Sequence, residues 1–179
     1  MFDLDTTLFL WLNATSASPA WVLALARFAS LQLPQLLIAG TVGALIVGDG
    51  RVRRLVARIA FAMAVAWVLA RIGHYLWPMP RPFVLGIGTA WIPHSASTGF
   101  PSMHSSVACA FAFAVAMFSG RWSMAALGLL AASLVAWSRV CLGLHFPTDV
   151  GAGALVGLLG ALSSRVIPDF VPSVRTAHD

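Results

Sequence analysis

Long apolar stretches constrain this chain more than any other feature of its sequence. Five of them approach or exceed the roughly 20 residues that a helix needs to cross a bilayer, at residues 20–47, 55–77, 103–119, 122–141 and 148–167. Only 9% of the 179 residues are charged, against roughly 25% in a soluble domain. The sequence therefore predicts an all-α fold, a polytopic membrane helical bundle that forms a single domain over residues 1–179.

The segments between these stretches are short. Residues 1–19 hold an apolar run that is too short to cross, and we expect a short helix lying in the membrane interface. Pro34 predicts a kink in the first span. Pro147 is expected in the first turn of the last span, and residues 83–101 should form a loop that folds back over the membrane surface. The two cysteines, Cys109 and Cys141, are interpreted as small buried hydrophobes.

The basic residues are all arginines, and they predict the orientation of the chain. By the positive-inside rule, the cytoplasmic side should carry the larger group, which comprises Arg51, Arg53, Arg54, Arg58, Arg121, Arg165 and Arg175. The N-terminus and the 83–101 loop should then face outward and the C-terminus inward. Four arginines remain on the outer half, where the rule predicts few: Arg27, Arg71, Arg81 and Arg139. Clustered anion binding would explain this excess.

A polar island at residues 138–149 interrupts two apolar stretches. His145 and Asp149 are four residues apart, so they would share one face of a helix, where a carboxylate can orient an imidazole. Arg139 adds a forked cation suited to phosphate or carboxylate. The alternative interpretation is a helix cap beside an arginine whose charged group reaches the interface. Ionisable residues in or beside membrane spans are nonetheless functional candidates by default.

Other polar residues are predicted at the same membrane surface. His74, His94 and His104 all fall on the outer side with His145. His104 begins the third span just after Ser102, whose hydroxyl is expected to cap that helix. The free backbone N–H groups at the helix start favour an anion. Guanidinium groups, a helix N-terminus, an imidazole paired with a carboxylate and a second imidazole indicate phosphoryl transfer. An oriented histidine can attack phosphorus, and a second one can protonate the leaving oxygen.

Three segments together resemble a known family. Arg81-Pro82, then Pro101-Ser102-Met103-His104, then Ser138-Arg139-x5-His145-x3-Asp149 are similar to the three-part signature of the type 2 phosphatidic acid phosphatase superfamily. That signature reads K-x6-R-P, P-S-x-H and S-R-x5-H-x3-D. The resemblance implies a helical bundle that hydrolyses phosphate esters without metal or other cofactor. It implies His145 as nucleophile, Asp149 as its orienting partner and His104 as general acid–base. It also implies a phosphate site at the motif residues Arg81, Arg139, Ser102 and Met103.

One position departs from the signature. The expected lysine falls at His74, which is shorter and only partly charged at neutral pH. We therefore hypothesise that Arg71 or Arg27 supplies the missing charge at the phosphate site. A narrower resemblance, carried by residues 91–105, links the chain to the bacitracin-resistance type of undecaprenyl pyrophosphate phosphatase. It implies undecaprenyl diphosphate as the substrate, a role in recycling the carrier lipid for cell-wall synthesis, and a bacterial inner membrane. His94, in the same stretch, is a candidate for contacting the second phosphate, and the alternative is a loop histidine in the membrane interface.

Several alternatives stay open from the sequence. The lipid could instead be phosphatidate, phosphatidylglycerol phosphate or a lipid A phosphate, and the phosphoryl group could pass to another lipid rather than to water. The outer histidines also allow a metal- or haem-binding protein, although the nearby arginines would repel a cation. A transporter is disfavoured because no polar groups cross the middle of the spans. The sparse basic residues give no nucleic-acid surface, and the oligomeric state is undetermined.

Overall fold

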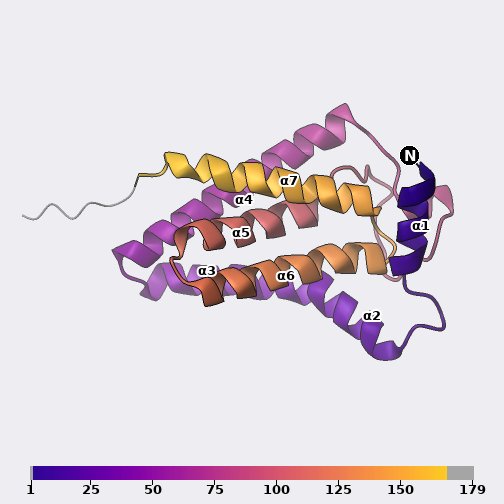
Figure 1. Cartoon of the computed structure of the whole chain (residues 1–179), viewed down its shortest axis with the longest axis horizontal. Coiled ribbons are helices and arrows are strands. Elements are labelled where there is room, and N and C mark those ends of the chain that lie inside the picture. The colour runs from indigo at the N-terminus through magenta and orange to yellow at the C-terminus, as the bar shows by residue number, and fades with distance from the viewer. Residues whose placement is uncertain (1, 169–179) are drawn as a thin grey trace, which may run out of the picture.

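The computed structural model describes residues 2–168, and in this range every regular element is helical (Figure 1). In chain order the elements are α1 (Phe2–Leu12), α2 (Ala20–Arg27), η1 (Phe28–Gln32), α3 (Leu33–Val47), α4 (Gly50–Leu76), η2 (Pro82–Leu85), α5 (Met103–Phe118), α6 (Trp122–Cys141), α7 (Pro147–Ser163) and η3 (Ser164–Val166). The predicted all-α fold is confirmed.

Four helical stretches are long and apolar enough to cross a membrane: Ala20–Val47, Gly50–Leu76, Trp122–Cys141 and Pro147–Val166. The fifth predicted span, Met103–Phe118, is apolar but has only 16 residues. At 1.5 Å per residue it is about 24 Å long, less than the roughly 30 Å hydrocarbon core. The chain is an integral membrane protein, and the apolar helix that is too short to be counted among its four candidate spans begins beside the polar motif at residues 101–104.

The first span is irregular, but the irregularity lies before the predicted position. A π-helix, η1, separates α2 from α3, and Pro34 is the second residue of α3. Proline has no N–H to donate to the carbonyl four residues earlier, which here belongs to Ser30 inside η1. The regular helical bond therefore fails one turn before the proline, and the π-helix accommodates the break.

The second span begins earlier than predicted, at residue 50 instead of 55. The side chain of Asp49 accepts hydrogen bonds from the backbone N–H groups of Arg51 and Val52, both at 2.9 Å. This N-cap extends α4 through the arginine cluster into the junction with α3.

Small residues let the central helices approach one another closely. A Cβ atom on Gly157 of α7 would lie 2.7 Å from the backbone nitrogen of Ala110 in α5. One on Gly160 would lie 2.4 Å from the carbonyl oxygen of Ala62 in α4. Alanines fill the shared core of α4, α5 and α7. Close contact through small residues is the usual way in which membrane helices associate, so Gly157 and Gly160 serve packing.

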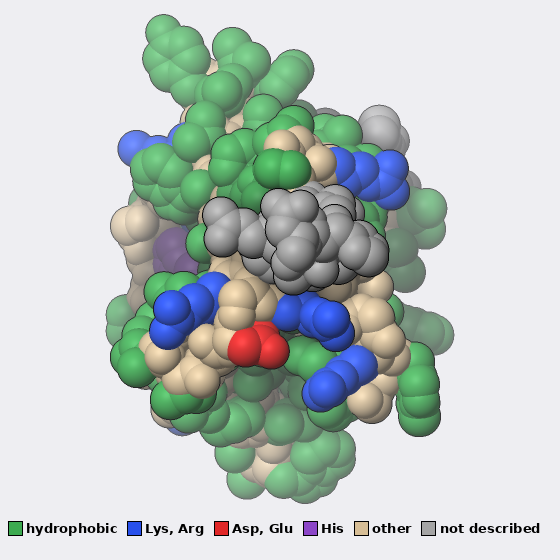
Figure 2. Space-filling model, turned by 90° about the vertical axis from the view of Figure 1, so that its left-hand side faces the viewer, with side chains coloured by type: hydrophobic (Ala, Val, Ile, Leu, Met, Phe, Trp, Pro, Cys, Tyr) green, Lys and Arg blue, Asp and Glu red, His purple; other side chains and the backbone are tan. Residues whose placement is uncertain are grey.

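The two ends of the bundle differ in what they carry. α1 runs across one end, next to the chain that joins α4 to α5 (Figure 1). The opposite end holds the α3–α4 and α5–α6 junctions, and Figure 2 shows arginine side chains gathered on it around an acidic one. Arg51, Arg53, Arg121 and Arg165 are exposed, while Arg175 lies outside the described residues. The bundle thus keeps the two predicted groups of arginines at opposite ends.

Candidate active site

The three polar motifs meet at the end of the bundle that α1 crosses. Arg81 lies just before η2, His104 is in the first turn of α5, and His145 lies in the turn between α6 and α7. Residues 81, 97, 98, 104 and 145 all line one cavity of about 480 Å³. The site predicted from three separate segments of sequence is therefore assembled in one place.

His145 is held between a cation and a carboxylate. Nη1 of Arg81 lies 2.8 Å from Nε2 of the imidazole, and a guanidinium can only donate. Nε2 is therefore the accepting nitrogen, and the proton of the neutral ring sits on Nδ1. Nδ1 lies 3.4 Å from Oδ2 of Asp149 without forming a hydrogen bond. This arrangement leaves the lone pair on Nε2, where it accepts from Arg81, and His145 is one of the residues that line the polar cavity.

His145 lies between the last two spans and is close to Asp149, but the two do not share one helix face, which was the arrangement considered from their spacing. α7 begins at Pro147, so only the aspartate is on the helix. His145 is presented by a tight turn in which the N–H groups of Leu144 and His145 both donate to the carbonyl of Arg139. Gly143 has φ +78°, a left-handed conformation that glycine adopts without strain. The turn brings the imidazole back over the first turn of α7.

Burial determines the protonation state of His145. Only 1% of His145 is exposed, and burial holds its pKa well below the usual value. The guanidinium groups of Arg81 and Arg139 lower the pKa of His145 further. The imidazole is therefore neutral at neutral pH, the state that a nucleophile requires. Burial also lowers the pKa of Arg81.

Arg81 and Arg139 are both buried, but their donors are used differently. Arg81 donates to the carbonyls of Ser97, Thr98 and Leu144 as well as to His145. Arg139 donates through Nη1 to the hydroxyl of Ser30 in η1, whereas its Nε and Nη2 have no partner in the structure. A buried guanidinium with unused donors is costly unless an anion occupies it. Arg139 is thus suited to bind a phosphate.

The second motif supplies a helix start and a histidine. Ser102 is the N-cap residue of α5, but its hydroxyl does not cap the helix as expected; it accepts a hydrogen bond from the hydroxyl of Ser105. The N–H of Ser102 donates to the carbonyl of Asp149, which joins α5 to α7. His104 is exposed toward the cavity. The imidazole of His104 is therefore accessible to a ligand, while Ser102 is buried.

The other predicted ligand-binding residues occupy different places. His74, Arg71, His94 and Met103 line the polar cavity. Nε2 of His74 lies 2.8 Å from the carbonyl oxygen of Pro101, so this ring supports the second motif. Arg71 stacks over the ring of Trp67 at 5.8 Å. Arg27 is not part of the cavity lining, and its guanidinium donates to the carbonyl of Trp91.

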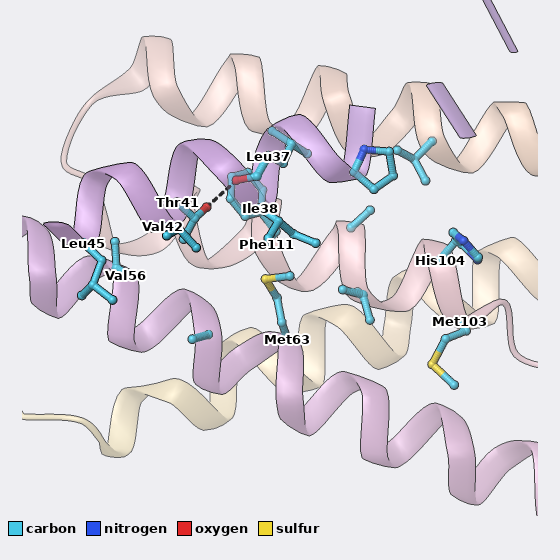
Figure 3. A pocket seen from close by; sticks show the side chains of 15 residues that line it. Leu37, Ile38, Thr41, Val42, Leu45, Val56, Met63, Met103, His104 and Phe111 are labelled. Atoms are coloured by element: carbon cyan, nitrogen blue, oxygen red, sulfur yellow. Dashed lines mark hydrogen bonds between the residues drawn. The ribbon is translucent and has the colours of Figure 1, made fainter. Parts of the chain in front are cut away.

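A second cavity of about 540 Å³ lies among the helices beside the polar one (Figure 3). It is lined by apolar side chains of α3, α4 and α5, such as Leu37, Ile38, Met63 and Phe111. Met103 and His104 lie at one end of it in Figure 3, and both also line the polar cavity. The two cavities therefore adjoin at the start of α5, with Met103 and His104 in the walls of both.

Some contributions to the site were missed from sequence. Ser30 lies 109 residues before Arg139 and carries no local signal of its contact. The carbonyls of Ser97, Thr98 and Leu144 that orient Arg81 are backbone groups, which a residue pattern does not reveal. Among residues 2–168, no group of three His, Cys, Asp or Glu side chains could hold a metal ion. Cys109 and Cys141 are buried and unpaired, as predicted.

Comparison with known proteins agrees with the motifs. YbjG of Escherichia coli (strain K12), provisionally named an undecaprenyl-diphosphatase, is 38% identical over 165 residues, 92% of this chain and 83% of that protein. Undecaprenyl-diphosphatase BcrC of Bacillus subtilis (strain 168) is 36% identical over 83 residues, 45% of this chain and 40% of that protein.

The fold also has a solved counterpart. The crystal structure of Aquifex aeolicus LpxE superposes with a TM-score of 0.73, covering 91% of this chain and 95% of that chain at 24% identity. Residues 55–171 match the PAP2 superfamily, and this range contains all three motifs. The chain therefore belongs to the PAP2 superfamily.

Proposed function

We propose that this protein is a membrane phosphatase that hydrolyses undecaprenyl diphosphate to undecaprenyl phosphate and inorganic phosphate. The observation that carries the proposal is the junction of the two cavities at His104. The polar cavity offers cations and a neutral imidazole to a diphosphate. The apolar cavity offers α3 and α4 side chains to the first isoprene units. Relatives named as undecaprenyl-diphosphatases support this choice of lipid.

The reaction proceeds in two steps through His145. Nε2 of His145 attacks the terminal phosphorus, and the bond from that phosphorus to the bridging oxygen breaks. His104 protonates the bridging oxygen as undecaprenyl phosphate leaves, and the phosphoryl group stays on the histidine. His104 then takes a proton from water, the water oxygen attacks phosphorus, and inorganic phosphate leaves with His145 restored.

The remaining residues orient and stabilise these groups. Asp149 keeps the proton of His145 on Nδ1 and stabilises the positive charge that the ring gains. The free donors of Arg139 bind the oxygens of the terminal phosphate, and Arg81 turns from Nε2 to those oxygens when the phosphate arrives. The start of α5 at Ser102–Met103 faces the same charge. Arg71 and His94 lie in the cavity wall and serve the second phosphate.

The test is phosphate release by the purified chain in detergent. We expect release from undecaprenyl diphosphate at a higher kcat/KM than from phosphatidate, phosphatidylglycerol phosphate or a lipid A phosphate. His145→Gln should abolish release from every lipid. A preference for a glycerolipid phosphate would contradict the proposed substrate, and no release from any lipid phosphate would contradict the phosphatase itself.

The same proposal fixes the site at the outer face of a bacterial inner membrane, where the carrier lipid is recycled for cell-wall synthesis. The opposite end with its exposed arginines would then face the cytoplasm. Both native cysteines are buried, so a cysteine introduced at Ser97 or Arg121 can be labelled alone. A membrane-impermeant thiol reagent on intact bacterial cells or spheroplasts should label S97C and spare R121C. The reverse pattern would overturn this orientation.

A further inference from the structure

The N-terminal helix α1 contacts the bundle through a single face. Asp5 and Phe9 of α1 and Asn13, the first residue after its end, are spaced by four residues. The N–H of Asn13 still donates to the carbonyl of Phe9, so the three residues lie in one row. Phe9 is fully buried and Asn13 is 7% exposed. Trp11, on the opposite face, is 87% exposed. One row of side chains therefore fixes α1 across the catalytic end of the bundle (Figure 1).

The first residue of this row caps α7. The helix begins with Pro147, and its N-cap residue, Phe146, has no polar side-chain atom to offer. Oδ1 of Asp5 accepts a hydrogen bond of 3.0 Å from the N–H of Thr148, and Oδ2 accepts one from the Thr148 hydroxyl. A carboxylate at a helix N-terminus satisfies a free donor and complements the helix dipole. Asp5 thus fixes the first turn of the helix that carries Asp149.

The last residue of the row caps α6. Nδ2 of Asn13 and the N–H of Ala14 both donate to the carbonyl of Cys141, the final residue of α6, at 3.1 and 2.9 Å. Asn13 also exchanges two hydrogen bonds with the backbone of Thr89. A Cβ atom on Gly143 would lie 2.1 Å from the carbonyl oxygen of Thr89, so only glycine allows this approach. Asn13 thus fixes the end of the helix that carries Arg139.

The middle residue of the row contacts the turn itself. The rings of Phe9 and Phe146 meet edge to face with their centroids 5.4 Å apart, an arrangement that stabilises aromatic pairs. Phe146 directly follows His145 and is 7% exposed. The three contacts of α1 therefore fall before, within and after the turn that presents the imidazole.

We propose that α1 holds the catalytic turn in position, with Asp5 and Asn13 as positioning residues for His145. By capping α6 and α7 from outside, α1 fixes the distance between Arg139, His145 and Asp149. An error of about 1 Å in the position of a reacting group can cost as much as a hundredfold in rate. The inference depends on the role of His145 proposed above. The competing account is that α1 only seats the protein in the membrane interface.

The test compares D5A, N13A, D5N and W11A as full-length protein in detergent. One readout is kcat and KM for a lipid phosphate that the unaltered protein hydrolyses. The second is the rise in Tm on adding orthovanadate, which imitates five-coordinate phosphorus and depends on no lipid. D5A and N13A should lower kcat about tenfold with KM within about twofold, and should shrink the vanadate shift. D5N retains an acceptor for Thr148 and should recover most of the kcat, while W11A should match the unaltered protein.

Two results would overturn this positioning role of α1. One is a kcat for folded D5A and N13A within about twofold of the unaltered protein. The other is an equal loss of kcat in W11A, which would show that α1 serves only to place the protein in the membrane interface. Because Asp5 lies near the surface, D5A is expected to fold, and its kcat alone tests the proposal if N13A does not fold. If the unaltered protein hydrolyses no lipid diphosphate yet binds vanadate, the proposed substrate is wrong. The Tm shifts of the variants on adding vanadate still test the positioning role of α1.

Discussion

Both ends of the bundle pair an aspartate at a helix start with nearby arginines, yet they use these groups differently. At the arginine-rich end, Asp49 accepts two backbone hydrogen bonds from the first turn of α4, and Arg51 and Arg53 beside it are exposed. At the catalytic end, Asp149 is 3% exposed and faces the imidazole of His145. Both aspartates accept backbone N–H groups at a helix start, since Oδ2 of Asp149 accepts the N–H of Phe146 at 3.0 Å. Asp49 does no more than this, whereas Asp149 is buried and also faces another side chain.

A pair of buried arginines sharpens the contrast. Arg58, at the arginine-rich end, donates through Nε and Nη2 to the carbonyl of Ile167 and lies 4.3 Å from the ring of Phe118. Arg139, at the catalytic end, is 1% exposed and leaves Nε and Nη2 without a partner. Because an unused buried donor costs stability, we attribute Arg139 to the proposed phosphate, whereas the contacts of the fold account for Arg58. Asp149 with Asp49, and Arg139 with Arg58, are therefore matched pairs for mutation.

The largest effect is expected at His145, which has no counterpart at the other end. Replacing it with glutamine removes the nucleophile while keeping a polar side chain of similar size. We expect kcat to fall at least about 10⁴-fold with an unchanged Tm, measured as phosphate release and thermal unfolding. Retention of a tenth of the unaltered kcat would rule out His145 as the attacking residue.

The two aspartates come next. D149N removes the charge that orients and stabilises the ring of His145, and we expect kcat to fall about 10³-fold. D49N is its control, because asparagine caps a helix about as well as aspartate and Asp49 lies at the far end. Its kcat should stay within about twofold of the unaltered value. Equal losses of kcat in D149N and D49N would contradict the proposed difference in role between the two aspartates.

The buried arginines should separate activity from stability. R139A should lower kcat about 10²-fold while leaving Tm unchanged or higher, since a charge with unused donors is removed. R58A should lower the free energy of unfolding by about 2 kcal/mol or more with kcat per folded molecule unchanged. Chemical unfolding and phosphate release on the same preparations measure both quantities. A destabilised R139A with intact kcat would show that the two arginines play the same structural role.

A smaller difference is expected between Arg71 and Arg27. Arg71 lines the polar cavity, so R71A should raise KM about fivefold. Arg27 is engaged by the Trp91 carbonyl outside that lining, so R27A should change KM by about twofold or less. If both variants keep full turnover and affinity, neither arginine replaces the family lysine.

The smallest effect is expected from removing metal ions. The proposed reaction uses cationic side chains where other phosphatases use metals. Activity in excess chelator should therefore equal activity without it, and adding Mg²⁺ back should change nothing. Loss of activity on chelation with recovery on adding metal would require a different mechanism.

Sequence was sufficient for those features that are encoded locally. The spans follow from apolar length, and Pro147 marked the start of α7 correctly. Four motif residues line the polar cavity, namely Arg81, Met103, His104 and His145. Three others, Ser102, Arg139 and Asp149, are buried and are not part of its lining. Sequence was less informative where tertiary contacts determine geometry: the spacing of His145 and Asp149 suggested one helix face, but Gly143 and Pro147 place His145 in a turn. Ser30, Asp5 and Asn13 act through partners more than 70 residues away, which no local pattern encodes.

The hydroxyl of Ser102 shows the same limit in a single residue. Its position before α5 predicted an N-cap, and it is the N-cap residue, yet its side chain bonds to Ser105 instead. Likewise, the lysine position at His74 is occupied by a ring that supports Pro101. In both cases the local pattern identifies the position, while the packing of neighbouring segments decides which atom the side chain contacts.

The central claim is that His145 carries the phosphoryl group, and rapid quenching tests it most directly. Undecaprenyl diphosphate labelled at its terminal phosphate would be mixed with the protein and quenched within one turnover. We predict protein-bound label that is labile to acid and stable to base, located on the peptide that contains His145 and absent from H145Q. Turnover without any protein-bound label, or label on His104 instead, would contradict the account.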